Sequence, residues 1–184
     1  MDDSGLLRGM LRVSIAILHL GVGFGAAHAS AQAVMPSAPF AALAIYHGDW
    51  TVRAVHPWSG AAAGATDLLK SRCNSFALYF ACEQTVNGKP QALIVYTVGE
   101  APGRFNTRTI APNGLAGGRG ELTINDNHWT YLDKPPANLK GPWSRVENTI
   151  VDSNHIQFEE YESIDEGKSW RQTNAGAEER IQTP

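Results

Sequence analysis

The sequence predicts an all-β protein, a single antiparallel up-and-down β-barrel of 8–10 strands with a short N-terminal helix. Three observations lead to this fold class. From Gly48 onward, turn signals interrupt the chain about every 8 to 12 residues. The segments between them alternate apolar and polar residues, and the joining loops are too short for parallel crossovers. An open sheet of this size would expose two edges, and closure into a barrel removes both.

Residues 1–33 are expected to form a signal peptide, which leaves residues 34–184 as the barrel domain. Arg8 and Arg12 precede a short apolar run, Val13 to Gly25, and the small-residue stretch AAHASAQA follows it. This order is typical of a secretory signal, and the run is shorter than the roughly 20 apolar residues of a membrane-spanning helix. Candidate cleavage positions follow Ala29, Ala31 and Ala33. We therefore expect a periplasmic or secreted protein that does not insert into a membrane once the leader is removed.

Composition restricts the partners of the domain. The 184 residues are 43% hydrophobic and 18% charged, which is typical of a folded globular protein. The formal net charge is -3, and no run of Lys and Arg is present. A nucleic-acid partner would require a clustered basic surface, so this class of function is excluded. Composition leaves the oligomeric state undetermined.

The first elements of the domain are a helix and a strand. Residues 34–47 contain the one helix expected after the leader, with Ser37 as a capping residue and Gly48 as its end. The apolar stripe of this helix would consist of Phe40, Leu43 and Ala44. The first strand begins at Gly48, and its inner face would carry Trp50, Val52 and Ala54.

Further strands follow one another along the chain. The segment SFALYFACEQTV is expected to place Phe76, Leu78, Phe80 and Cys82 on one face. Asn87-Gly88 then favours a tight hairpin. The next strand, QALIVYTV, is almost continuously apolar, as expected of a strand covered on both sides. The series is completed by GRFNTRTI, GELTI, HWTYL, GPWSRVENTIV, HIQFEEYES and KSWRQT.

The two cysteines, Cys73 and Cys82, leave two alternatives open. An oxidising compartment permits a disulfide. Direct pairing would place the turn at Ala77-Leu78, a poor turn dipeptide, whereas a turn at Asn74-Ser75 would put the cysteines out of register. The alternative is two unpaired buried thiols. Two thiols alone do not supply the four ligands of a closed zinc site.

The segment GDW resembles the G-x-W signature that opens the first strand of lipocalin-like (calycin) barrels. This resemblance implies that Trp50 closes one end of the barrel and that a late arginine, here Arg180, lies across its ring. The chain is also similar to bacterial secreted lipocalin-like proteins of unknown function, on the strand containing Cys82–Gln84 and the late segment Ser163–Trp170. The likeness covers roughly residues 40–181. It implies a fold and a compartment, and it supplies no catalytic residue.

The late segment SIDEGKSW has the pattern of an Asp-box. Asp165 is expected to bind nearby backbone N–H groups, Gly167 to adopt a positive φ, and Trp170 to fold back into the core. Sialidase propellers carry several such copies, and this chain carries one. We therefore interpret the segment as a hairpin clamp and not as a glycosidase signature.

No motif of a nucleophile, a phosphate loop or a dinucleotide site is present. The four histidines after the leader lie at the ends of separate elements, so we predict no metal and no cofactor: His47, His56, His128 and His155. His56 shares the parity of Trp50, which leaves open an inward position for it.

Charged groups on the late strands raise the possibility of catalysis. Arg145 and Glu147 share a face with Trp143, and Glu160 shares one with Phe158. An enzyme such as a lyase, isomerase or hydrolase would need at least two of Arg145, Glu147 and Glu160 to converge inside a cavity. The sequence identifies no catalytic residue, and whether the protein is an enzyme stays open.

The aromatic residues are spread over different strands and are the candidates for ligand binding. The candidate residues are Phe80, Tyr96, Phe105, Trp129, Tyr131, Trp143, Arg145 and Tyr161. In a small barrel such residues either fill the interior or line a cavity, and the sequence does not decide between these. We interpret the protein as an exported, non-enzymatic barrel that binds a small apolar or amphipathic molecule. The alternatives are a small barrel enzyme and an envelope interaction protein that binds through the loops NGLAGGRGE and DKPPANLKGPW.

Overall fold

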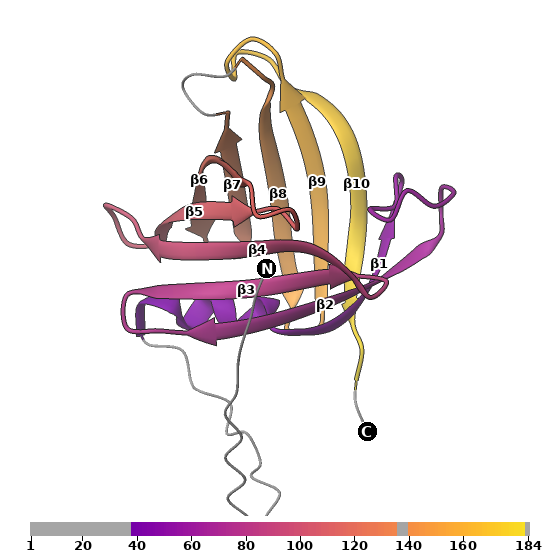
Figure 1. Cartoon of the computed structure of the whole chain (residues 1–184), viewed down its shortest axis with the longest axis horizontal. Helices are drawn as coiled ribbons and strands as arrows, with labels where there is room; N and C mark the ends of the chain where they lie inside the picture. Colours follow the sequence, from indigo (N-terminus) through magenta and orange to yellow (C-terminus); the bar gives the residue numbers. More distant parts are fainter. Residues whose placement is uncertain (1–37, 136–139, 183–184) are drawn as a thin grey trace, which may run out of the picture. The chain divides into compact units, whose positions relative to one another are not determined.

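The structure is a computed structural model, and it describes residues 38–135 and 140–182. Ten antiparallel strands form a closed barrel in which neighbours in sequence are neighbours in space, with β1 pairing both β2 and β10 (Figure 1). The elements are η1 Ala38–Tyr46, β1 Gly48–Ala54, β2 Thr66–Ser75, β3 Tyr79–Val86, β4 Lys89–Val98, β5 Arg104–Ile110, β6 Ala116–Asn125, β7 His128–Lys134, β8 Trp143–Asp152, β9 His155–Ser163 and β10 Arg171–Arg180. The predicted fold class is confirmed.

The predicted signal peptide and the capping residue Ser37 lie outside the described residues. In the part of the chain that is described, no helix has the length and apolar character needed to cross a membrane.

The two ends of the barrel differ. One end carries η1, the tight turns after β2, β4, β6 and β8, and the last residue of β10. The other end carries the longer loops, including the one after β1 (residues 55–65) and the β9–β10 hairpin loop. We call the first the helix end and the second the loop end.

The helix η1 is a 3-10 helix, and its period explains how it packs. With three residues per turn, residues three apart lie along one edge. Phe40 and Leu43 are fully buried on that edge, and Tyr46 continues it. The predicted helix is confirmed, but its apolar stripe ends in Tyr46 rather than in Ala44, because Tyr46 and not Ala44 lies three residues after Leu43. A 3-10 helix is narrower than an α-helix, which suits it to the closed end of a small barrel.

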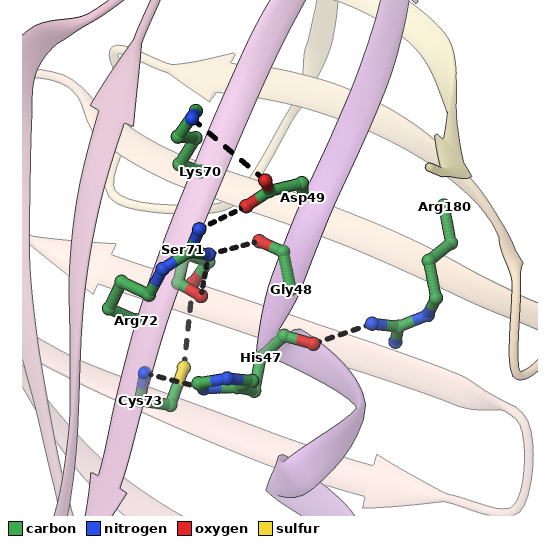
Figure 2. Close-up of polar contacts among 8 residues, drawn as sticks. All are labelled: His47, Gly48, Asp49, Lys70, Ser71, Arg72, Cys73 and Arg180. Carbon is green, nitrogen blue, oxygen red and sulfur yellow. Dashed lines mark hydrogen bonds and ion pairs between the residues drawn. The ribbon is translucent and has the colours of Figure 1, made fainter. Parts of the chain in front are cut away.

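The G-x-W segment at the start of β1 closes the helix end. Trp50 is only 1% exposed, and the Arg180 guanidinium lies over its ring at 4.0 Å. Arg180 also donates a hydrogen bond to the carbonyl oxygen of His47 (Figure 2) and another to that of Ile45, at the end of η1. Gly48 has φ +142°, and a Cβ there would collide with the guanidinium. The expected roles of Trp50 and Arg180 are confirmed, and the glycine is required by the close approach of Arg180.

Polar contacts join the end of η1 to β1 and β2 (Figure 2). The Nδ1 atom of His47 accepts a hydrogen bond from the backbone N–H of Cys73 at 3.0 Å. Arg72 forms an ion pair with Asp49 and donates to the carbonyl of Gly48. His47 is therefore a structural residue that ties the helix to β2.

The hairpin of β2 and β3 differs from the prediction. The strand β2 was not expected, and the predicted second strand begins only at Tyr79. Phe76 donates its backbone N–H to the Tyr79 carbonyl at 2.8 Å, so the turn lies at Ala77-Leu78. Leu78 is 81% exposed, and Phe76 stacks on the Tyr79 ring outside the barrel. The register of the hairpin fixes the turn at Ala77-Leu78. Phe76 and Leu78 therefore lie at the turn and do not share the inner face on which Phe80 lies.

Cys73 and Cys82 lie directly opposite each other in this hairpin and form a disulfide. The alternative of two unpaired thiols is therefore wrong. The alternative of a turn at Asn74-Ser75 is also wrong, because cross-strand pairing of the cysteines overrides the poor turn propensity of Ala77-Leu78.

Removing the disulfide tests how much it stabilises the barrel. The double variant Cys73→Ser/Cys82→Ser is expected to lower the free energy of unfolding by about 2 to 3 kcal/mol, since the bond closes a loop of about ten residues. Urea unfolding followed by tryptophan fluorescence measures this change. An unchanged midpoint would show that the unfolded chain without the disulfide is already as restricted at this hairpin as the chain with it.

Two outer-face expectations are corrected. The sequence predicts that β4 is covered on both sides, but Leu93 is exposed, because the outer face of β4 lies on the barrel surface. The Asp-box clamp is confirmed: Asp165 accepts from the backbone N–H of Ser169 at 2.8 Å, and Gly167 has φ +87°. Trp170, however, packs on the outer face of the barrel over Arg145 and not in the core.

Candidate ligand cavity

The interior of the barrel is filled at the helix end and hollow towards the loop end. A cavity of about 270 Å³ lies between the packed helix end and the loop end. It is larger than the cavity of about 150 Å³ that admits benzene, and it falls just short of the ~300–1,000 Å³ typical of sites for larger ligands. The cavity therefore has room for a molecule of roughly two fused rings. Trp58 from the loop after β1, Asp133 near the end of β7 and Ser144 near the start of β8 line it, which places its mouth at the loop end.

The walls of the cavity are mixed in character. The aromatic lining residues are Tyr46, Trp58, Tyr96, Tyr131 and Phe158. The neutral polar lining residues are Gln84, Thr107, Thr109, Ser144 and Asn148. Such a combination of apolar surface with a few hydrogen-bonding groups is typical of sites for small molecules.

Three tyrosines from three elements meet at the deep end of the cavity. The hydroxyl groups of Tyr96 on β4 and Tyr131 on β7 are 2.6 Å apart. Tyr46 of η1 accepts a hydrogen bond from the side-chain amide of Asn148 at 3.3 Å. Burial raises the pKa of all three phenols above the ordinary value of 10.0, so they remain neutral hydrogen-bonding groups at any physiological pH.

Glu178 is the charged group deepest in this environment. It lies on β10, opposite Val52 of β1 and Ile156 of β9, and its side chain lines the cavity. Burial raises its pKa from 4.5 to about 7. In the part of the chain that the structure describes, no side chain donates a hydrogen bond to its carboxyl group or pairs with it.

Two further carboxyl groups line the cavity nearer its mouth. Glu160 accepts a hydrogen bond from Nε1 of Trp58 at 3.0 Å. Burial raises the pKa of Asp133, although the backbone N–H of Lys134 and the charge of Arg108 act in the opposite direction. The Oδ1 atom of Asp133 is buried without a hydrogen-bond partner among the described residues. Of the residues that are described as lining the cavity, none is Lys, Arg or His.

The predicted ligand-binding residues fall into three groups. Tyr96 and Tyr131 line the cavity. Phe80, Phe105 and Trp129 also point inward, but they belong to the packed core at the helix end. Phe40 explains this packing, because its ring contacts those of Phe80 and Phe105, with centroids 6.3 and 5.9 Å away.

The third group, Trp143, Arg145 and Tyr161, lies on the outer face and does not line the cavity. Ser144, Val146 and Asn148 of β8 point inward, so the residues between them point outward. Arg145 lies between the rings of Tyr161 and Trp170, at 4.6 and 4.5 Å. The β9–β10 hairpin loop also covers Trp143, since Gly167 packs against its ring. These residues thus find their partners outside the barrel.

The postulated catalytic cluster is not assembled. Glu147 pairs with Arg145 on the outer face at 3.1 Å, and of the three groups only Glu160 faces the cavity. The histidines supply no alternative: His56 is exposed, and no group of three metal-binding side chains occurs among the described residues. The inward position considered for His56 is therefore wrong.

Sequence reasoning missed most of the cavity lining, including four residues that decide its chemistry and shape: Tyr46, Trp58, Asp133 and Glu178. Two of them carried a signal. Glu178 is two residues before Arg180, so a strand places both on the inner face, and Asp133 has the same relation to Tyr131. Trp58 lies in a loop, and no periodicity could have placed it at the cavity.

The architecture is a closed, ten-stranded antiparallel β-barrel with a short 3-10 helix at one end. No family model and no curated protein matches the chain. Among solved structures, it is similar to Rv2717c from M. tuberculosis, with a TM-score of 0.52 and 13% identity, over 80% of this chain and 99% of that one. The S-type phycobiliprotein lyase CPES from Guillardia theta is more distant, with a TM-score of 0.46 and 8% identity, over 76% of this chain and 90% of that one. At 13% identity the likeness to Rv2717c supports the fold alone, and the likeness to CPES is too distant to support any conclusion.

Proposed function

We propose that this protein is an exported, non-enzymatic carrier that holds one small amphipathic molecule inside its barrel. The observation that supports the proposal is the cavity of about 270 Å³, with aromatic walls and hydrogen-bonding groups at its deep end. A barrel that acts only through its surface loops would gain stability from filling this space, because unfilled volume costs packing energy. The signal-like leader is the basis for export.

A small barrel enzyme is the second candidate, and one observation favours it. The pKa of Glu178 at about 7 is suited to general acid–base catalysis at neutral pH. The catalytic group would then be Glu178, and not the predicted set of Arg145, Glu147 and Glu160. Recovery of a chemically altered ligand after incubation would favour the enzyme, and recovery of the unaltered ligand favours the carrier.

Isothermal titration of the purified full-length chain with 2-naphthalenemethanol tests the proposed cavity. At about 0.5 kcal/mol per non-hydrogen atom, a ligand of this size would have a dissociation constant on the order of 10–100 μM. The variant Ser144→Trp places a large ring at the mouth, at an exposed position, and is expected to weaken binding at least tenfold.

The matched control is Val151→Trp, an exposed position near the other end of the same strand. It is expected to bind as the unmodified protein does. Equal affinities of the two tryptophan variants would place the bound molecule elsewhere, and the absence of binding to naphthyl compounds of any charge would contradict the proposed function.

A further inference from the structure

The carboxyl groups of the cavity differ in how far the protein itself satisfies them. Glu160 has the indole N–H of Trp58 as a donor. Asp133 has the backbone N–H of Lys134 and the nearby charge of Arg108, although its Oδ1 atom has no hydrogen-bond partner among the described residues. Glu178 has neither a donor nor a cation in the described part of the chain.

A buried carboxyl group without a partner is costly for a protein, because desolvation is not offset by hydrogen bonds or by an opposite charge. Replacing Glu178 with an apolar residue would remove this cost without disturbing the register of β10. Its place at the cavity wall, facing the ligand space, indicates that its partner is a group on the ligand.

The groups that face Glu178 determine what that ligand group is. Tyr46 of η1 and Tyr96 of β4 are close enough for the Glu178 charge to affect them, and Tyr131, Asp133 and Glu160 complete the titratable groups of the lining. All of these are neutral or acidic. A ligand anion would be repelled, whereas a cation would meet a carboxylate and several aromatic faces, which attract cations through their quadrupoles.

We propose that the ligand is a small aromatic or alicyclic amine, whose protonated nitrogen pairs with Glu178 at the deep end of the cavity. This inference rests on the proposed function and specifies the chemical class of the ligand. The carboxylate accepts charge-assisted hydrogen bonds from the ammonium group, the tyrosine hydroxyls are within the same cavity to accept others, and the apolar walls enclose the ring.

Three probes of nearly equal shape test the charge of the ligand: 2-naphthylmethylamine, 2-naphthalenemethanol and 2-naphthoic acid. Titrated into the full-length protein at pH 8, the amine is expected to bind at least tenfold more tightly than the alcohol, and the acid more weakly than both. If the alcohol binds as tightly as the amine, the inference is overturned while the proposed function stands. If none of the three binds, both are overturned.

The variant Glu178→Gln identifies the residue responsible. It is expected to lower the affinity for the amine at least tenfold and to leave that for the alcohol within about threefold, with Glu179→Gln as the matched control. Glu179 is the adjacent, exposed carboxylate on the outer face of β10. An equal loss in both variants, or no loss in Glu178→Gln, would overturn the assignment to Glu178.

The pH dependence gives an independent readout. An aliphatic amine stays protonated between pH 6 and 8, whereas Glu178, with a pKa of about 7, ionises over this range. The affinity of the unmodified protein for the amine is therefore expected to rise roughly tenfold from pH 6 to pH 8, in proportion to the ionised fraction of Glu178. The Glu178→Gln variant is expected to show a flat profile, and a rise of the same size in the variant would contradict the proposal.

Discussion

Replacing Trp50 with alanine is expected to lower the free energy of unfolding by about 3 to 5 kcal/mol, the cost typical of removing a buried tryptophan. The side chain is almost completely buried, and it packs in one core cluster with Val52, Leu69 and Phe158. Its removal opens a void at the helix end and leaves the Arg180 guanidinium without the ring that it covers. Urea unfolding at pH 7 measures the change.

The contact of Trp50 with Arg180 is separable from the burial of the ring. In a double-mutant cycle with Trp50→Leu and Arg180→Met, the coupling energy is expected to be about 1 to 2 kcal/mol, because the guanidinium is partly desolvated over the ring. Trp143→Ala, on the outer face, is the control for the loss of a tryptophan and is expected to cost clearly less. Equal losses in Trp50→Ala and Trp143→Ala would contradict the role of Trp50 as the closure of the barrel.

The closure of the barrel could be predicted because its parts have local signals. The G-x-W segment, the position of Arg180 and the short connections are all visible in the sequence, and periodicity assigns most strands to their inner and outer faces. The strand β2 was missed because its inner face includes Asp67 and Ser71 while its outer face carries Leu68, so that apolar and polar residues do not alternate regularly. Asp67 is buried there because Ser59 and Asn87 donate hydrogen bonds to it from two loops, which no local pattern indicates.

The cavity could be predicted only in part, because inward orientation does not distinguish a filled interior from a hollow one. Phe80 and Tyr96 are cross-strand neighbours with the same orientation, and yet only Tyr96 reaches the cavity. What separates them is the depth to which Phe40 and Leu43 of η1 enter the barrel, which is a tertiary property. The assignment of Trp143, Arg145 and Tyr161 to the ligand site failed for a related reason, since the β9–β10 hairpin loop covers them from outside.

The Glu178→Gln variant is expected to be more stable than the unmodified protein at pH 8. Between pH 4.5 and pH 8, the stability of the variant relative to that of the unmodified protein is expected to rise by about 3 kcal/mol. The sign follows from the direction of the pKa shift. Glu178 binds its proton up to a pKa of about 7 when folded, against 4.5 in the unfolded chain. Between these values the folded state holds more protons than the unfolded state, so the stability of the unmodified protein falls as the pH rises through this window and does not fall further above it.

Glutamine is neutral at every pH, so the variant lacks this loss, and other titrating groups cancel in the comparison of the two proteins. Urea unfolding of both proteins at half-unit steps from pH 4.5 to pH 8 measures the difference, and Glu179→Gln is expected to run parallel to the unmodified protein. Parallel curves for Glu178→Gln would show that its carboxyl group is solvated. Because a bound cation would relieve the same penalty, 2-naphthylmethylamine at saturating concentration is expected to raise the stability of the unmodified protein at pH 8 more than that of Glu178→Gln.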